Sequence, residues 1–146
     1  MDSSAKWFWE LVYTVSFVII LCISTVDSAK TRNDKIGVRN IGGGLVELLE
    51  YYYEYGHASE ESKATLTIQE RNGQEEVLVE VFLNGQVGLD KVVAMVEKTG
   101  STVVAKFAGF RFGVLSAYVP LNKIETVAQI VGVQSEMGVT RPVHGS

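Results

Sequence analysis

Cysteine and histidine are scarce in this chain, and their scarcity limits the chemistry that the protein can perform. The single cysteine among 146 residues, Cys22, lies inside an apolar run near the N-terminus. If that run is cleaved off, no thiol remains, which excludes a disulfide framework, a cysteine nucleophile and a cysteine metal site. His57 and His144 have no second histidine, cysteine or spaced carboxylate pair beside them, so no metal site is predicted.

The chain also lacks an excess of positive charge and recognisable catalytic motifs. The net charge is −4 and no basic patch stands out, so a nucleic-acid partner is not expected. Glycines 42–44 precede a predicted helix, but the lysine and Ser/Thr of a P-loop are missing and no strand leads into them. Neither histidine occupies a recognisable position for a Ser-His-Asp triad. The sequence therefore predicts a protein that is not an enzyme and has no cofactor.

One long apolar run, residues 11–26, is present and is preceded by Lys6. This pattern is typical of a secretory signal peptide, and Val26 with Ser28 makes an acceptable signal-peptidase site. We expect residues 1–28 to be a signal peptide and the mature protein to be secreted to the extracellular space or the periplasm. The alternative is an uncleaved signal anchor that attaches the protein to a membrane through the apolar run.

The mature chain begins with a polar stretch and one amphipathic helix. Residues 29–44 are polar and end in three glycines, so they are expected to form a flexible leader. Leucines recur at helical spacing over residues 45–55, with glutamates opposite, and Gly56 is a natural C-terminal cap, so a helix is predicted there. The polar residues 57–63 are interpreted as a solvated loop.

A hairpin and an alternating series of strands and helices follow. Two strands, at 64–70 and from residue 76, flank Asn72-Gly73, a dipeptide that suits a tight turn. The later expected elements are a helix with an apolar stripe at Leu89, Val92, Val93 and Val96 that ends before Gly100, strands at 102–108 and 112–119, a helix at 121–131 and a strand from Val133. A capping box is expected between Asn122 and Glu125. The carboxylates of this region, at Glu75, Glu76 and Glu80, are interpreted as surface groups of a strand.

The element order from residue 76, β-α-β-β-α-β, is that of the split βαβ or ferredoxin-like fold. The predicted fold class is α+β, with an antiparallel sheet and two helices on one face over residues 76–142. A helix and a hairpin strand, residues 45–75, precede this domain, and residues 143–146 form a tail. The composition, 47% hydrophobic and 21% charged, suits one compact domain.

Strand alternation divides the predicted sheet into a helix-covered inner face and an uncovered outer face. The inner face is expected to hold Val77, Val79, Val81, Val103, Ala105, Phe107, Leu115, Ala117 and Val119. The outer face is expected to hold Leu78, Glu80, Phe82, Val104, Lys106, Phe112, Val114, Ser116 and Tyr118. Six of these nine outer residues are apolar or aromatic, too many for a face that meets water. Either the helix at 45–55 or a partner protein is expected to cover them.

Several segments carry a resemblance to one family. They are VLVEVFLNG (77–85), DKVVAMVEKTGSTVVAKF (90–107), VLSAYVPLNKIETVAQIVGVQSE (114–136) and the closing TRP (140–142). These segments resemble the N-terminal propeptides of subtilisin-like serine proteases, the inhibitor I9 type, and their stand-alone inhibitor relatives. The sequence departs from the family at Glu136-Met137-Gly138 and at Arg141-Pro142, and no protease catalytic domain occurs in these 146 residues.

The resemblance implies a partner and a binding mode. Propeptides of this family pack an open sheet face on surface helices of the protease, lay a C-terminal tail in its cleft, and act as chaperones and inhibitors. The implied contact face consists of Phe82, Phe112, Val114 and Tyr118. The implied tail consists of Val139, Thr140, Arg141, Pro142, Val143 and His144.

Three functions are therefore under consideration. The first is a secreted, non-enzymatic domain that binds, inhibits or chaperones a subtilisin-like serine protease. The second is a secreted structural or interaction module of the same fold with no protease partner, or the N-terminal fragment of a larger secreted protein. The third is a small-molecule sensor, which rests on analogy of fold alone.

Overall fold

The computed structural model describes residues 40–142, and this part of the chain is α+β, as predicted. Its helices and strands are β1 (Ile41–Gly42), α2 (Leu45–Tyr55), α3 (Glu60–Thr65), β2 (Ile68–Arg71), β3 (Gln74–Leu83), α4 (Leu89–Lys98), β4 (Thr102–Phe107), β5 (Val114–Pro120), the 3-10 turn η1 (Leu121–Lys123), α5 (Ile124–Ala128) and β6 (Val133–Gly138). The predictions for residues 1–28, Cys22, leader residues 29–39, Val143 and His144 lie outside the described residues. Within 40–142 no helix is both long and apolar enough to span a membrane.

The sheet has six strands, and β3 is at its centre. Its order is β1-β6-β3-β5-β4, and β2 pairs with the first residues of β3. Strands β5 and β6 run antiparallel to β3, whereas β1 runs parallel to β6, with Ile41 opposite Glu136. Strand β1 lies inside the segment predicted as a flexible leader. That prediction is wrong for residues 41–42, because their main-chain groups pair with the edge of β6.

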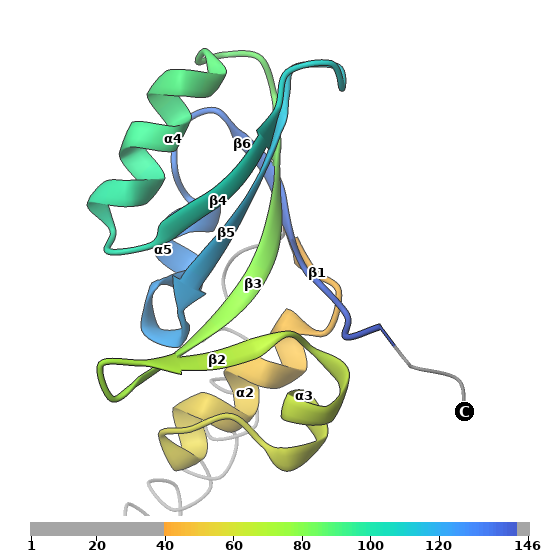
Figure 1. Cartoon of the computed structure of the whole chain (residues 1–146), viewed down its shortest axis with the longest axis vertical. Coiled ribbons are helices and arrows are strands. Elements are labelled where there is room, and N and C mark those ends of the chain that lie inside the picture. The colour runs from red at the N-terminus through yellow and green to blue at the C-terminus, as the bar shows by residue number, and fades with distance from the viewer. Residues whose placement is uncertain (1–39, 143–146) are drawn as a thin grey trace, which may run out of the picture. The chain divides into compact units, whose positions relative to one another are not determined.

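The inner face of the sheet carries the core. Val77 lies opposite Val119, Val79 opposite Ala117, and Val81 opposite Leu115, and all six side chains are buried. Helices α4 and α5 lie on this side of the sheet (Figure 1). They contribute the buried residues Val92, Val96, Ile124, Val127 and Ala128. The alternating strand residues and the regularly spaced helix residues thus form one core, as the sequence predicts.

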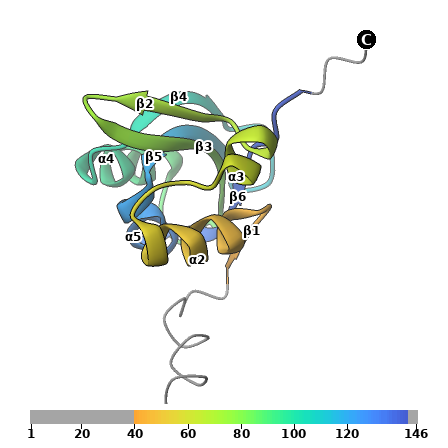
Figure 2. The same cartoon turned by 90° about the horizontal axis from the view of Figure 1, so that it is seen from below.

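Helix α2 lies beside α5 on this same side of the sheet (Figure 2). The Tyr53 hydroxyl donates a hydrogen bond of 2.8 Å to Glu125 of α5. Burial and this bond raise the pKa of Tyr53 to about 12. A Cβ on Gly138, which pairs with Val79 of the inner face, would lie 3.2 Å from Leu45. The expectation that α2 covers the outer face is therefore wrong.

Local capping signals explain where the helices agree with or differ from the sequence predictions. Gly56, in the left-handed conformation, ends α2 as predicted. The predicted loop 57–63 is partly wrong, because the Ser59 side chain accepts a hydrogen bond from the Ser62 amide and begins α3. The predicted helix at 121–131 is shorter and splits into η1 and α5. Its expected capping box is absent from these described elements, because Asn122 and Glu125 accept hydrogen bonds from Gln74 and Tyr53 instead.

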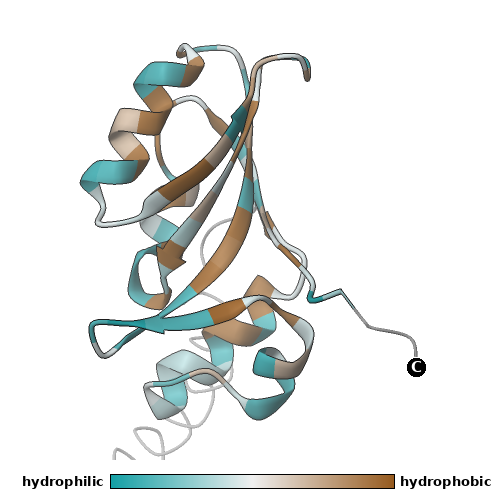
Figure 3. Cartoon of the chain, in the orientation of Figure 1, coloured by the Kyte–Doolittle hydropathy of each residue, from teal (hydrophilic) through white to brown (hydrophobic). Residues whose placement is uncertain are grey.

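The hairpin between β2 and β3 forms as predicted. Asn72 and Gly73 have φ angles of 53° and 74°, which the tight turn requires. The tip of the hairpin is hydrophilic, whereas the central part of β3 is hydrophobic (Figure 3). Glu76 is buried rather than on the surface as predicted, because Arg71 at 2.9 Å and Gln69 at 3.1 Å both contact its carboxylate.

Strand β4 departs from regular alternation. Its pairing with β5 shifts between Val103 and Ala105, so that Ala105 lies opposite Ser116, Lys106 opposite Leu115, and Phe107 opposite Val114. Lys106 consequently lies on the helix side and forms an ion pair of 2.5 Å with Asp90 of α4. The predicted sides of Ala105, Lys106 and Phe107 are therefore wrong, since a bulge reverses the side that each later residue faces.

Candidate functional site

The outer face of the sheet is the candidate site. Its register places Leu78 opposite Tyr118, Phe82 opposite Val114 on one side and Ser135 on the other, and Glu80 opposite Met137. On the edge strand, Phe107 lies opposite Val114. Phe82, Val114 and Tyr118 are half-buried, whereas Phe107 and Met137 are exposed. Among the described residues no helix lies across this face as α2, α4 and α5 lie across the other (Figures 1 and 2).

A tight turn between β4 and β5 carries two further aromatic rings, Phe110 and Phe112. The turn projects beyond the sheet on the side away from α4 (Figure 1). The Gly113 amide donates a 2.6 Å hydrogen bond to the Phe110 carbonyl, and Arg111 at the apex has a φ of 42°. A non-glycine residue in this conformation is uncommon and is often held in place at functional sites. The turn separates Phe110 and Phe112 by one residue and directs both rings toward neighbouring elements.

Four phenylalanines, two on strands β3 and β4 and two in the turn after β4, are grouped here as an aromatic cluster: Phe82, Phe107, Phe110 and Phe112. Phe110 packs edge-on against Phe82, with ring centroids 5.9 Å apart. Phe112 covers Gly85, where even a Cβ would lie 2.5 Å from the ring. Phe107, Phe112 and Phe110 nevertheless remain 60%, 57% and 47% exposed. Clustered, exposed phenylalanines of this kind mark an interaction surface more often than isolated apolar residues do.

Sequence reasoning found part of this site and missed the rest. Of the four residues predicted for the contact face, Phe82 and Val114 pair with each other on the sheet and Phe112 lies in the adjoining turn. Tyr118 is on the same face but four residues further along β5, opposite Leu78. Phe107 was assigned to the wrong face, and Phe110 and Met137 were not identified. The spacing of two aromatic residues around Arg111 could have indicated Phe110. Nothing in the alternation of β4 could have indicated Phe107, because the bulge has no sequence signal there.

The predicted tail is held in the domain over its first three residues. The Val139 amide donates to the Leu78 carbonyl at 3.0 Å, and the Val139 carbonyl accepts from the Thr67 amide at 2.9 Å. Thr140 pairs with Leu66, and the Arg141 amide donates to the Thr65 carbonyl at 2.8 Å. These three residues therefore are not available for substrate-like pairing in a protease cleft. Pro142 is the first tail residue beyond these bonds.

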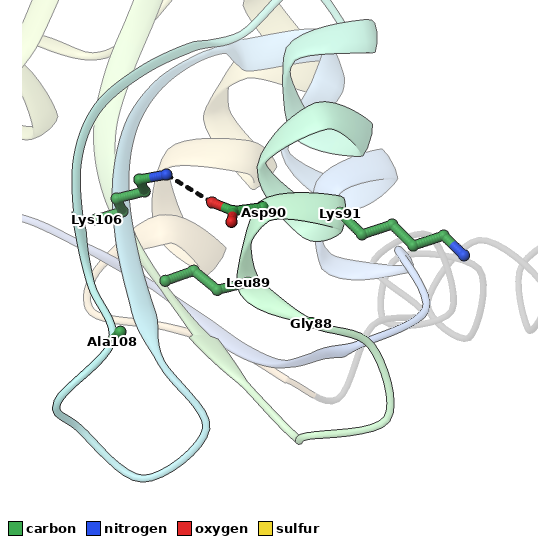
Figure 4. Close-up of a pocket in the computed structure, with 6 residues that line it drawn as sticks. All are labelled: Gly88, Leu89, Asp90, Lys91, Lys106 and Ala108. Atoms are coloured by element: carbon green, nitrogen blue, oxygen red, sulfur yellow. Dashed lines mark hydrogen bonds and ion pairs between the residues drawn. The ribbon is translucent and has the colours of Figure 1, made fainter.

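Two hollows lie away from the outer face, and neither brings together side chains suited to catalysis. The larger, of about 420 Å³, lies at the start of α4 and is lined by Gly88, Leu89, Asp90, Lys91, Lys106 and Ala108. There Lys106 neutralises Asp90, and the side chain of Lys91 points away (Figure 4). The smaller, of about 290 Å³, lies between the end of α2 and the hairpin and includes His57, Glu70 and Glu75.

Two titratable groups beside the smaller hollow, Glu75 and His57, have structural partners. Glu75 accepts a 2.7 Å hydrogen bond from the Ala58 amide and pairs with Lys63 at 3.1 Å. His57 is exposed, lies edge-on to the Tyr51 ring and contacts the Ala58 carbonyl through Nδ1. Among residues 40–142, no three histidine, cysteine or acidic side chains are grouped so that they could hold a metal ion.

Comparisons of the chain with protein-family models, with characterised proteins and with solved structures find no match.

Proposed function

We propose that this chain is a secreted, non-enzymatic domain that binds a subtilisin-like serine protease through the outer face of its sheet. The observation that carries the proposal is the aromatic cluster on the open sheet face and in the adjoining β4–β5 turn. Three of its four rings, Phe107, Phe110 and Phe112, are about half or more exposed. The resemblance of residues 76–142 to protease propeptides supplies the class of partner. Secretion rests on the predicted signal peptide.

We further propose that residues 76–142 have the ferredoxin-like topology of such propeptides. Two features support this assignment. The elements run β3-α4-β4-β5-α5-β6, and the corresponding strands lie side by side in the order β6-β3-β5-β4 with antiparallel neighbours. This order and pairing support the assignment to a split βαβ domain. Strands β1 and β2 and helices α2 and α3 are then additions at one end.

The proposed binding mode is a flat, aromatic-centred interface. A standard interface buries roughly 800 Å² on each partner, and aromatic residues are enriched at its centre. The phenylalanines of the cluster supply such a centre, while Glu80, Ser116 and Ser135 supply polar groups on the same face. The face therefore carries most of the affinity in this proposal, and the tail adds contacts from Pro142 onward.

The main-chain bonds of Val139, Thr140 and Arg141 favour a second candidate function. A propeptide that inhibits by lying in the cleft needs a free tail, and here the start of the tail is part of the sheet. A secreted interaction module of the same fold, binding a protein other than a protease through the outer face, needs no free tail. The two functions differ in whether protease activity falls when the chain binds.

The deciding experiment titrates several subtilisin-type proteases with the full chain and measures both binding and residual activity. We expect binding at micromolar concentration or tighter, with activity falling as the complex forms. A serine protease of the trypsin type serves as the specificity control and should keep its activity. If no subtilisin-type enzyme binds or is inhibited at micromolar concentration, the protease proposal is wrong. Binding without inhibition would assign the outer face to docking alone.

A further inference from the structure

Glu136 is a buried acid without a counterion or a hydrogen bond. Its exposed fraction is 0%, and neither carboxylate oxygen has a hydrogen-bond partner in the described part of the chain. Glu76 is also buried, but its carboxylate has the partners that Glu136 lacks, because it contacts both Arg71 and Gln69. A buried carboxylate left unpaired is costly, and such a group becomes neutral instead of staying charged.

The register places Glu136 in apolar surroundings on the inner face. It lies opposite Val81 of β3 on one side and Ile41 of β1 on the other. Helix α5, which packs against β6, has Ile124, Val127 and Ala128 buried. The sequence analysis singled out Glu136-Met137-Gly138 as a departure from the propeptide pattern, and the structure gives that departure a physical meaning.

No charged side chain among the described residues compensates Glu136. The titratable residues of β3, η1 and α5 are Glu75, Glu76, Glu80, Lys123 and Glu125. Those of α2 are Glu47, Glu50, Tyr51, Tyr52, Tyr53, Glu54 and Tyr55. Glu80 lies on the opposite face beside Met137, and Glu125 accepts a hydrogen bond from Tyr53. Burial alone raises the pKa of Glu136 to about 8.

We propose that Glu136 makes the β1–β6 edge of the domain a pH-sensitive device, closed when this carboxyl is protonated and loosened when it ionises. The ionised form must draw water into the core between β6 and α5. The first bonds exposed to that change are those of β1, including the 2.8 Å bond from the Glu136 amide to the Asn40 carbonyl. This inference goes beyond the proposed function and stands whether or not a protease is the partner.

The direction of the effect follows from linkage. The folded-state pKa of Glu136, about 8, lies above the ordinary value of 4.5, so the folded protein binds a proton that the unfolded chain releases. The stabilisation is complete below about pH 4.5. It falls as the pH rises through the window from 4.5 to about 8, because the unfolded chain gains its charge while the folded core stays neutral. Above about pH 8 the dependence levels off.

The test compares urea unfolding of the full chain at pH 5 and pH 8 with that of Glu136→Gln. From folded and unfolded pKa values of about 8 and 4.5, we expect the unfolding equilibrium constant of the parent to rise roughly 400-fold between these pH values because of Glu136. Glu136→Gln should remove that rise, because glutamine carries no charge. The matched control is Glu80→Gln, an exposed glutamate on the outer face, which should retain the full rise. An equal rise in the parent and in Glu136→Gln would overturn the proposal.

Two measurements on the unsubstituted chain keep the proposal testable if Glu136→Gln fails to fold. Carbon-13 NMR of the Glu136 carboxyl should give a titration midpoint near 8, and a midpoint near the ordinary 4.5 would overturn the proposal. Amide exchange, corrected for its intrinsic pH dependence, should show protection lost first at the Glu136 amide and in β1, with β4–β5 amides retained. Equal loss of protection in all strands would also overturn it.

Discussion

Replacing Leu48 by alanine should lower the free energy of unfolding by about 2–5 kcal/mol, the range for a leucine removed from a packed core. Leu48 lies on α2 and is fully buried together with Leu45 and Leu49. Sequence analysis treats α2 as an element that precedes the domain, whereas the structure makes it part of the inner-face core. Chemical denaturation of the full chain measures the change.

The matched control for Leu48→Ala is Glu50→Ala on the exposed side of the same helix. Glu50 is exposed, and alanine favours the helix slightly more than glutamate does, so stability should change by less than about 0.5 kcal/mol. A loss below about 1 kcal/mol for Leu48→Ala would mean that α2 packs loosely and does not complete the core.

Replacing Phe112 or Tyr118 by alanine should each weaken binding to the protease partner by about 2 kcal/mol or more, which is roughly thirtyfold in Kd. Aromatic residues near the centre of an interface usually carry most of its binding energy. Phe112 is exposed in the β4–β5 turn, and Tyr118 lies on the outer face opposite Leu78. We expect Phe110→Ala to act in the same direction, because Phe110 packs against Phe82. Calorimetric titration measures each Kd.

Val131→Ala is the control for these binding variants. Val131 is also an exposed apolar residue, at 64%, but it lies after α5 in the loop before β6. Its substitution should leave the Kd within about twofold. If Val131→Ala weakens binding as much as Phe112→Ala does, the interface lies on the helical side and the assignment of the outer face is wrong.

Local signals made much of the fold predictable from the sequence. The Asn72-Gly73 turn and the Gly56 cap are conformational requirements that few other residues meet, so the hairpin and the end of α2 were placed correctly. The alternation of β3 and β5 was also correct, because every second residue is buried over 77–83 in β3 and over 115–119 in β5. The contact-face residues Phe82, Val114 and Tyr118 followed from that alternation.

The features that were missed depend on contacts between distant parts of the chain. A bulge in β4 reverses the sides of Lys106 and Phe107, and the pairing of Lys106 with Asp90 becomes visible only once α4 lies against β4. Strand β1 forms because the edge of β6 is available to Ile41, and neither segment indicates the other in sequence. Helix α2 likewise lies on the side of the sheet where it contacts α5, and the sequence does not indicate this contact.

The burial of Glu136 also could not be predicted from the sequence. Strand alternation alone allows its side chain to face either the core or the solvent, and an acidic residue suggests the solvent. The register with Val81 places it in the core instead. A buried acid such as Glu136 can therefore be recognised only after the pairing of β6 with β3 is known.

The measurement that tests the account most directly is NMR chemical-shift mapping of the labelled full chain with a catalytically inactive subtilisin-type protease. The account predicts that the perturbed methyl and aromatic resonances belong to the outer face and the β4–β5 turn, with Phe82, Phe110, Phe112 and Val114 among the largest changes. Resonances of Val92 and Val96 in the core beneath α4 should change little. Perturbations centred on α4 and α5, or none at saturating protease, would contradict the claim that the uncovered sheet face is the binding surface.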